Sequence, residues 1–480
     1  MLSTLGRSQI TLQKVLKAQV GGGLHPLTFT PMARYTTITS SKSMLNTGHN
    51  INVGARQMRS TLFSRSSSSS IINVDTPFNV IGRNSNSNMS RSYTSTSSSS
   101  STQEQESQKQ EQKQEQEEEV VEDIGRKRVG RWLLFSAGLV GVMVVVGGIT
   151  RLTESGLSMV EWKPIVGAIP PLTQQQWEEE FDRYKQYPEY QKLNKGMTLN
   201  EFKQIFFWEY SHRLMGRMIG VAFFFPFVYY LRKGYIDRTL AKKLTAIFLL
   251  GGAQGALGWY MVKSGLDEKL IVGEVPRVSQ YRLAAHLGSA FVIYSSLLWY
   301  GLDLVSPRLS QAVKAGLKPN AATLSVLRYA SPVAGMIFLT AMSGAFVAGL
   351  DAGLIYNTFP LMGGQWVPED LINPRIQPAY KNMFEHDVTV QFQHRVLATL
   401  TYASILGLTQ LARRGRGGLT PRARLAANSL AVMGTAQVIL GISTLLTFVP
   451  VSLGASHQAG SLTLLSIAIW LLHELKKLPK

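Results

Sequence analysis

Eight long apolar segments constrain the fold of this chain more than any other feature of its sequence. A helix of about 20 mostly apolar residues crosses the hydrocarbon core of a bilayer, and each segment is close to that length. Backbone groups inside a bilayer must be hydrogen-bonded within the segment, so runs of this kind predict helices. The predicted spans are Trp132–Ile149, His212–Leu231, Leu244–Val262, Leu283–Leu302, Tyr329–Leu350, Val390–Leu411, Leu425–Val449 and Val451–Leu472.

The composition supports a membrane protein and excludes several other classes. Only 16% of the 480 residues are charged, against about a quarter in soluble proteins. The net charge of +19 would suit a nucleic-acid binder, but the basic residues lie in the N-terminal leader and between the apolar runs, so no nucleic-acid binding is expected. The absence of cysteine excludes disulfides, iron–sulfur clusters, thiolate-ligated haem and C-x-x-C-H haem attachment.

The first 124 residues are polar. No Asp or Glu precedes Asp75, while Arg, Lys, Ser and Thr are frequent. That composition is typical of a mitochondrial transit peptide, which we predict over residues 1–75; a disordered Ser/Thr tail is the alternative. Residues 76–124 are rich in Ser, Asn, Gln, Glu and Lys and predict a disordered low-complexity spacer, because they can bury little apolar surface.

Basic residues also predict the orientation. They cluster before the first span, between spans two and three, between spans six and seven, and after span eight. With eight spans, these clusters share one side of the membrane, which the positive-inside rule assigns to the matrix. We therefore expect a multi-pass protein of the mitochondrial inner membrane with both mature termini in the matrix. The clusters lie within Arg126–Arg131, Arg232–Lys243, Arg413–Arg424 and Lys476–Lys480.

The two halves of the membrane region repeat each other. Four correspondences occur in the same order, and an even number of spans in each half makes the repeats parallel. We predict an all-α membrane protein whose eight transmembrane helices form two tandem, parallel-repeat four-helix bundles, over residues 125–310 and 325–475. The matching pairs are EYSHR (Glu209–Arg213) with QFQHR (Gln391–Arg395), AQGALG (Ala253–Gly258) with AQVILG (Ala436–Gly441), His286 with His457, and more weakly ESGL from Glu154 with DAGL from Asp351.

Four histidines open the even-numbered spans, within one or two turns of the outer surface if the orientation is right. Two parallel helices of one bundle can then direct their imidazoles at each other, which suits a haem iron with two histidine ligands. Ionisable residues inside membranes are costly and tend to be functional. Two other histidines lack repeat partners and are expected at the surface. The predicted ligands are His212, His286, His394 and His457, and the two surface residues are His386 and His473.

Charged residues near these histidines differ between the halves. Glu209 lies three residues before His212, on the same helix face, whereas the matching Gln391 cannot take a proton. We therefore predict chemistry in the first half, with Glu209 as a general base or charge stabiliser; a helix N-terminal carboxylate favoured by the macrodipole is the alternative. Three arginines near the ligands could bind haem propionates or extend to the membrane interface. They are Arg213, Arg217 and Arg395.

These motifs resemble the heme A synthase family. The resemblance covers about Gly130 to Leu472, and its first motif is long and highly specific. Together with the predicted transit peptide, it favours the mitochondrial type of the family. The motifs are GGITRLTESGLSMVEWKPIVGAIPPL (Gly147–Leu172), EYSHRLMGR from Glu209, the AAH that ends at His286, QFQHR from Gln391 and GASHQAG (Gly454–Gly460).

The resemblance implies an enzyme that oxidises the C8 methyl group of heme O to the formyl group of heme A by successive hydroxylations, for use in cytochrome c oxidase. It implies a haem b cofactor on His394 and His457, the substrate haem on His212 and His286, and Glu209 as the catalytic residue. It also implies a ferredoxin electron donor; heme O synthase and a second copy of the chain are further candidate partners. Cysteine pairs found in the outer loops of some bacterial relatives are absent here. A diheme electron-transfer cytochrome and a haem transporter or chaperone remain as alternatives.

Overall fold

The computed structural model describes residues 99–163, 166–271, 275–307 and 309–478. Within these ranges the regular secondary structure is helical, apart from one isolated β-bridge between Met362 and Gln365. Residues Gln110–Lys480 fall in one compact unit that contains both predicted halves. The predicted transit peptide and the start of the predicted spacer lie outside the described residues.

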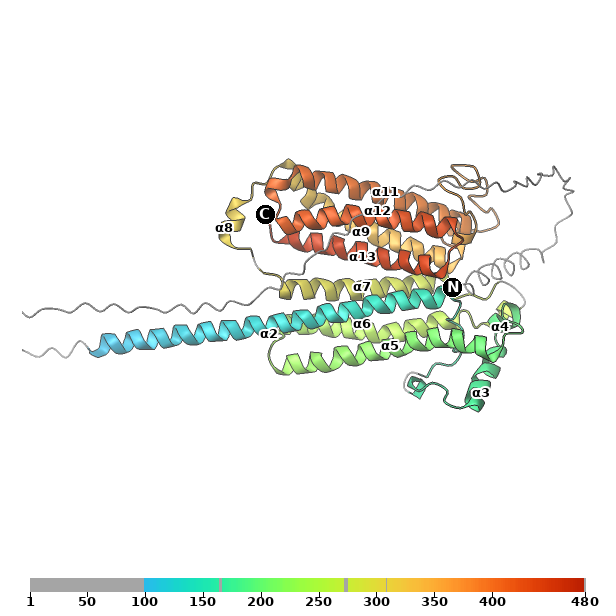
Figure 1. The fold of residues 1–480 in the computed structure, drawn as a ribbon, viewed down its shortest axis with the longest axis horizontal. Helices are drawn as coiled ribbons and strands as arrows, with labels where there is room; N and C mark the ends of the chain where they lie inside the picture. The colour runs from blue at the N-terminus through green and yellow to red at the C-terminus, as the bar shows by residue number, and fades with distance from the viewer. Residues whose placement is uncertain (1–98, 164–165, 272–274, 308, 479–480) are drawn as a thin grey trace, which may run out of the picture. The chain divides into compact units, whose positions relative to one another are not determined.

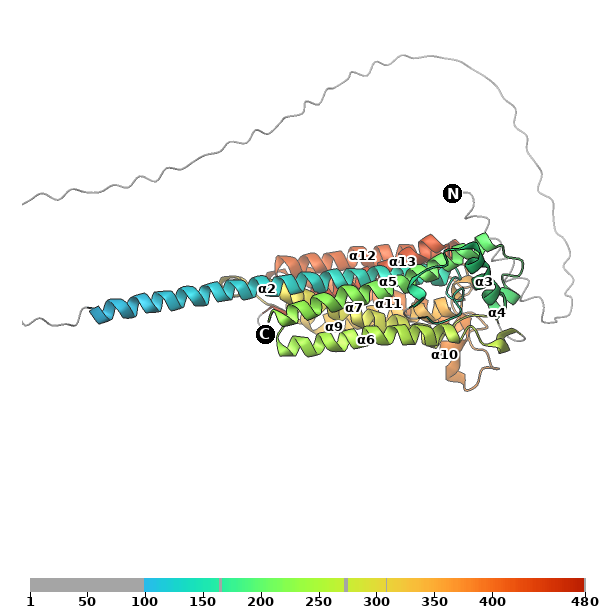
Figure 2. The same ribbon diagram turned by 90° about the horizontal axis from the view of Figure 1, so that it is seen from below.

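Eight helices of 26 residues or more dominate the described part of the chain and run side by side (Figures 1 and 2). Seven of them are long and apolar enough to cross a membrane, so the chain is an all-α membrane protein. The exception is α11, which has 28 residues and packs against α9 and α12. The eight are α2 (Ser99–Leu152), α5 (Leu199–Arg232), α6 (Arg238–Lys263), α7 (Gln280–Val305), α9 (Ala321–Gly349), α11 (Asp387–Arg414), α12 (Pro421–Leu446) and α13 (Val451–Lys476).

The predicted eighth span and the tandem repeat therefore stay predictions, although the helices follow the predicted order. Pro226 and Pro332 lie inside α5 and α9, whereas Pro450 caps the N-terminus of α13. A proline at this position breaks no hydrogen bond of the helix, because the N–H groups of the first turn have no acceptor within the helix.

One face of α12 shows how the bundle meets lipid. Leu425, Val432, Ile439 and Leu446 are exposed at seven-residue intervals, which places them along one face of the helix. Leu430, on another face, is 1% exposed. Large exposed apolar side chains along the whole length of a helix are uncommon on a soluble monomer and fit contact with hydrocarbon.

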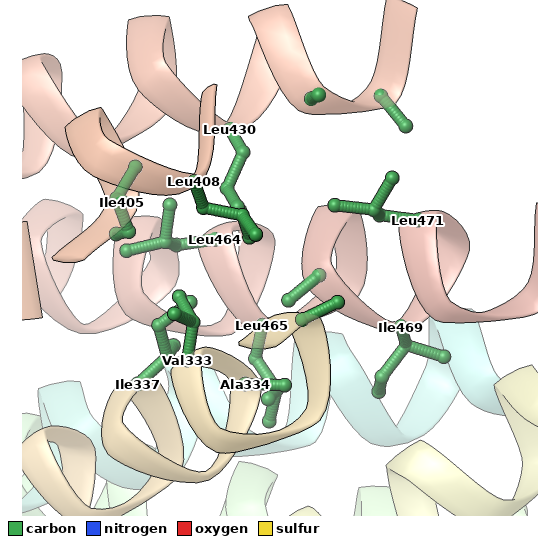
Figure 3. Packing of buried hydrophobic residues seen from close by; sticks show 14 of the residues in the cluster. Val333, Ala334, Ile337, Ile405, Leu408, Leu430, Leu464, Leu465, Ile469 and Leu471 are labelled. Carbon is green, nitrogen blue, oxygen red and sulfur yellow. The ribbon is translucent and has the colours of Figure 1, made fainter. Parts of the chain in front are cut away.

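The largest apolar core lies among α9, α11, α12 and α13 (Figure 3). Ile337 of α9, Ile405 of α11, Leu430 of α12 and Leu464 of α13 are all buried in it. Burying a large aliphatic side chain contributes about 1.5–3 kcal/mol. Inside a bilayer, van der Waals packing between helices takes the place of the hydrophobic effect as the main stabilising term. These contacts therefore determine how the four helices pack against one another.

Short helices cover the end of the bundle where the long loops lie. These are α3 (Gln174–Lys185), α4 (Pro188–Lys192) and α10 (Asn382–Glu385), while α8 (Gln311–Gly316) lies at the opposite end (Figures 1 and 2). The loop after α2 packs on the start of α5, where Phe202 and Phe206 meet Phe181 and Tyr184. A capping box between Thr198 and Glu201 starts α5 well before its predicted apolar span.

Part of the predicted disordered spacer is helical instead. Helix α2 begins at Ser99 and continues without a break into the first span, so residues 99–124 depart from the prediction. Gln, Glu and Lys are good helix formers, and a segment next to an existing helix avoids the cost of nucleation. Low apolar content therefore did not predict the backbone conformation of this segment.

The prediction of an exposed His473 is wrong. This residue is 2% exposed, and its Nε2 lies 3.0 Å from Asp303 Oδ1 on α7. Lys476 binds the same carboxylate. The lack of a repeat partner says nothing about burial, and α13 continues beside α7 past the apolar span. His386, the other predicted surface histidine, is half-buried at the N-cap of α11.

Candidate functional site

All the predicted site residues line one large cavity in the described part of the bundle. Its volume is about 1930 Å³, whereas pockets for drug-sized ligands measure about 300–1,000 Å³. The cavity therefore has room for more than one large ligand. Its lining includes Glu209, His212, Arg213, Arg217, His286, Gln391, His394, Arg395 and His457.

The four histidines are brought together in the predicted pairs. His212 on α5 and His286 on α7 are close enough to interact electrostatically, and so are His394 on α11 and His457 on α13. Three of them lie about two turns from the start of their helices, and their depth below the outer membrane surface stays a prediction. The exception is His212, because α5 extends outward to Leu199.

Each histidine ring lies against a glycine of the preceding long helix. A Cβ atom at Gly147 would lie 2.9 Å from His212 Nε2, and one at Gly441 would lie 2.8 Å from His457 Cε1. Neither distance is possible for a real Cβ without movement of the ring. The other two contacts, each with a Cε1 atom, are 3.2 Å for Gly258 with His286 and 3.3 Å for Gly344 with His394.

These glycines occupy matching positions in the two halves. Gly258 and Gly441 end the AQGALG and AQVILG motifs, and Gly147 precedes Glu154 by the same spacing as Gly344 precedes Asp351. The sequence therefore carries this signal, because each of the four glycines stands at a fixed distance from a motif of the repeat.

Polar neighbours of the histidines also match between halves. Gln254 Nε2 donates to the carbonyl oxygen of His286 at 3.3 Å, and Gln437 Nε2 donates to that of His457 at 2.7 Å. The Nδ1 atoms of His286 and His457 are buried and have no hydrogen-bond partner among the described residues.

A buried polar atom without a hydrogen-bond partner lowers the stability of the fold by about 1–3 kcal/mol. A bound ligand, or a water molecule bound with it, can offset that cost. Imidazoles are the commonest metal ligands in proteins. The four histidine side chains line a cavity that is large enough to hold haem. The residues present therefore fit two bis-histidine haem sites.

Glu209 lies beside the first pair in a fixed position. It is 4% exposed, and Arg213 Nε donates to its Oε1 at 2.5 Å. Because α5 begins at Leu199, Glu209 lies more than two turns inside the helix, where the macrodipole has little effect. The interpretation as a helix-terminal carboxylate is therefore wrong.

Two of the predicted arginines hold the loops that follow α2 and α9. Arg213 donates to the carbonyls of Met159 (2.8 Å) and Glu161 (3.0 Å), and Arg395 donates to those of Tyr356 (2.6 Å) and Thr358 (2.9 Å). These loop carbonyls follow Glu154 and Asp351 at identical spacings.

Arg217, the third predicted arginine, donates to the carbonyl of Lys163 at 2.9 Å. All three arginines line the cavity, and their contact with propionates stays a prediction. The sequence predicted propionate binding or extension to the membrane interface for these arginines, and did not predict their contacts with the loops.

An ion pair that the sequence did not predict joins the C-terminal end of α2 to the segment that follows α9. Arg151 at the end of α2 binds Asp351 at 2.6 Å, and Arg277 donates to the neighbouring carbonyl of Leu350. Glu154 and Asp351 share a left-handed backbone, with φ of 52° and 53°. The repeat pairs these two residues, but only the structure reveals the arginine between the halves.

Comparison with known proteins gives one consistent result. Residues 130–469 match the family model described as a cytochrome oxidase assembly protein. Over 354 residues the chain is 51% identical to the heme A synthase COX15 of Mus musculus, covering 74% of this chain and 83% of that one. It is 50% identical to the Homo sapiens protein of the same name over 352 residues, covering 73% and 83%. It is also 49% identical to a heme A synthase of Nitrosospira multiformis over 352 residues, covering 73% and 94%.

Proposed function

Because the chain belongs to the heme A synthase family of cytochrome oxidase assembly proteins, we propose that it oxidises the C8 methyl group of heme O to the formyl group of heme A. It is then an oxidoreductase of heme A biosynthesis that works inside a membrane. One observation carries the residue assignments: two matched histidine pairs line one cavity, and a buried carboxylate stands beside only one of them.

The substrate haem belongs in the first half, between His212 and His286. Glu209 lies one turn from His212 on the same helix face, and its bond to Arg213 fixes its position. Each hydroxylation of a C–H bond requires protons to move, and a carboxylate can accept or return them. Arg213 is itself held by two loop carbonyls, so the loop, the arginine and the carboxylate form one rigid set.

In the second half, His394 and His457 would hold a haem b cofactor, which supplies one-electron redox chemistry when bound. The chain gives this site no acidic residue at the position of Glu209. Gln391 instead donates through Nε2 to the carbonyl of Tyr356 at 3.2 Å. The second site can therefore hold its haem without a carboxylate that would exchange protons with it.

Location and partners follow from the same proposal. The acid-free N-terminus and the basic clusters support a mitochondrial inner-membrane protein with a transit peptide over residues 1–75 and both mature termini in the matrix. A ferredoxin would deliver electrons, and heme O synthase or a second copy of the chain would be further partners.

The test is the haem content of cells that lack this protein. We expect heme O to accumulate and heme A to be absent in mass spectra of extracted haems, and the intact gene to restore heme A. A diheme electron-transfer cytochrome or a haem transporter would leave the conversion itself intact. Normal heme A levels in the deletion strain would therefore reject the proposed function.

A further inference from the structure

A second buried carboxyl group lies in the same cavity as Glu209. Glu189, at the start of the short outer helix α4, is 4% exposed and lines the cavity. Tyr184 of α3, which is fully buried, donates from its Oη to Glu189 Oε2 at 2.9 Å. Asn194 Nδ2 donates to the same Tyr184 Oη at 2.7 Å, which leaves the phenolic proton for Glu189.

Burial makes this carboxyl group easy to protonate. It raises the pKa of Glu189 to about 8; the Tyr184 hydrogen bond and Arg151 oppose the increase, and Glu154 and Glu209 add to it. Burial and the nearby Glu189 also raise the pKa of Tyr184, which therefore remains a donor. The adjoining short helix η2 (Glu268–Ile271) packs against α4, and its charged residues Glu268 and Lys269 are exposed.

The two carboxyl groups therefore differ in a useful way. Glu209 is held by a guanidinium, whereas the direct hydrogen-bond partner of Glu189 is a neutral phenol. A carboxyl group that burial keeps protonated can donate a proton inside a site. The two residues are also close enough to interact electrostatically.

We infer that Glu189, positioned by Tyr184, holds and exchanges protons for the substrate site, as a second carboxyl group that acts with Glu209. The inference rests on the proposed function. Hydroxylation of a methyl group releases protons when water supplies the oxygen atom and consumes them when dioxygen does. In either case protons must pass between the reacting group and water, and Glu189 is a cavity-lining acid on the outer-loop side of that path.

The test compares the pH dependence of heme A formation in membranes that contain the full chain and are supplied with heme O. Wild-type activity is expected to fall as the pH rises through about 8, where Glu189 loses its proton. Glu189→Gln is expected to lose that fall and to react about 100-fold more slowly, at the low end of acid–base contributions. Glu179→Gln, an exposed carboxylate of α3, is the matched control and should behave as wild type.

Tyr184→Phe provides a second test, because the direction in which it shifts the pH profile of activity can be predicted. The Tyr184 hydrogen bond favours the ionised carboxylate, so its loss should raise the pKa of Glu189 and move the alkaline fall to higher pH. Phenylalanine fills nearly the same volume, which keeps the test available if Glu189→Gln does not assemble. A merely structural role for the pair would change yield without moving the profile.

Thermal unfolding provides a measurement that does not depend on activity. A carboxyl group whose folded-state pKa is raised binds an extra proton in the folded state, so its stabilisation is lost as the pH rises from its ordinary pKa to about 8. Wild type should lose stability over this range relative to Glu189→Gln. If both variants keep the wild-type pH profile, the inference is wrong. If wild type itself makes no heme A, the proposed function fails instead.

Discussion

Glu209→Gln is expected to slow heme A formation by about 100-fold or more, the range of general acid–base contributions, while both haem sites stay filled. Glutamine has nearly the same shape as glutamate but cannot accept or return a proton at neutral pH. The readout is the conversion of heme O to heme A, with the visible spectrum of the purified protein as the measure of haem content.

The second half of the chain shows that this change is compatible with the fold. Gln391 already occupies the matching position, and Arg395 is held there by loop carbonyls without a carboxylate. In the variant, Arg213 would keep its bonds to Met159 and Glu161. A loss of activity with full haem content would therefore report chemistry. Wild-type turnover in this variant would reduce Glu209 to a partner of Arg213.

The pairing of the histidines was predictable because it depends on two local regularities. Apolar runs of membrane-spanning length placed the helices, and the repeated motifs put His212 and His394, and likewise His286 and His457, at equivalent positions. Helix periodicity then placed Glu209 on the ligand face. None of these steps requires knowledge of a contact between distant segments.

The rest depended on contacts that local pattern does not encode. The sequence placed Arg213 and Arg395 at the site. It could not show that their N–H groups donate to backbone carbonyls of the loops after α2 and α9, such as those of Met159 and Tyr356. The Arg151–Asp351 ion pair joins residues 200 positions apart. Glu189 lies in the long loop between α2 and α5, and its burial depends on the packing of α3 on α5 and of α4 on α3.

Gly441→Ala is expected to weaken haem binding in the second half by about 10–100-fold, as do changes to other groups that orient a metal ligand. The new methyl group would stand 2.8 Å from His457 Cε1, so the ring must move away from its present direction. The readout is the haem b absorbance of the purified protein. Gly407→Ala on α11 is the control, since a Cβ there meets nothing within 4 Å and alanine favours the helix by about 0.5–1 kcal/mol.

The matching change in the first half makes the test decisive for the division of labour. A methyl group at Gly147 would lie 2.9 Å from His212 Nε2, so Gly147→Ala should impair substrate binding and heme A formation yet keep the resident haem b. If instead Gly147→Ala loses the haem b absorbance and Gly441→Ala keeps it, the cofactor lies in the first half. Glu209 would then stand beside the resident haem, and its proposed role toward the substrate would be wrong. A Cβ atom at Gly147 would contact only His212, and one at Gly441 only His457. Each variant therefore tests one histidine pair.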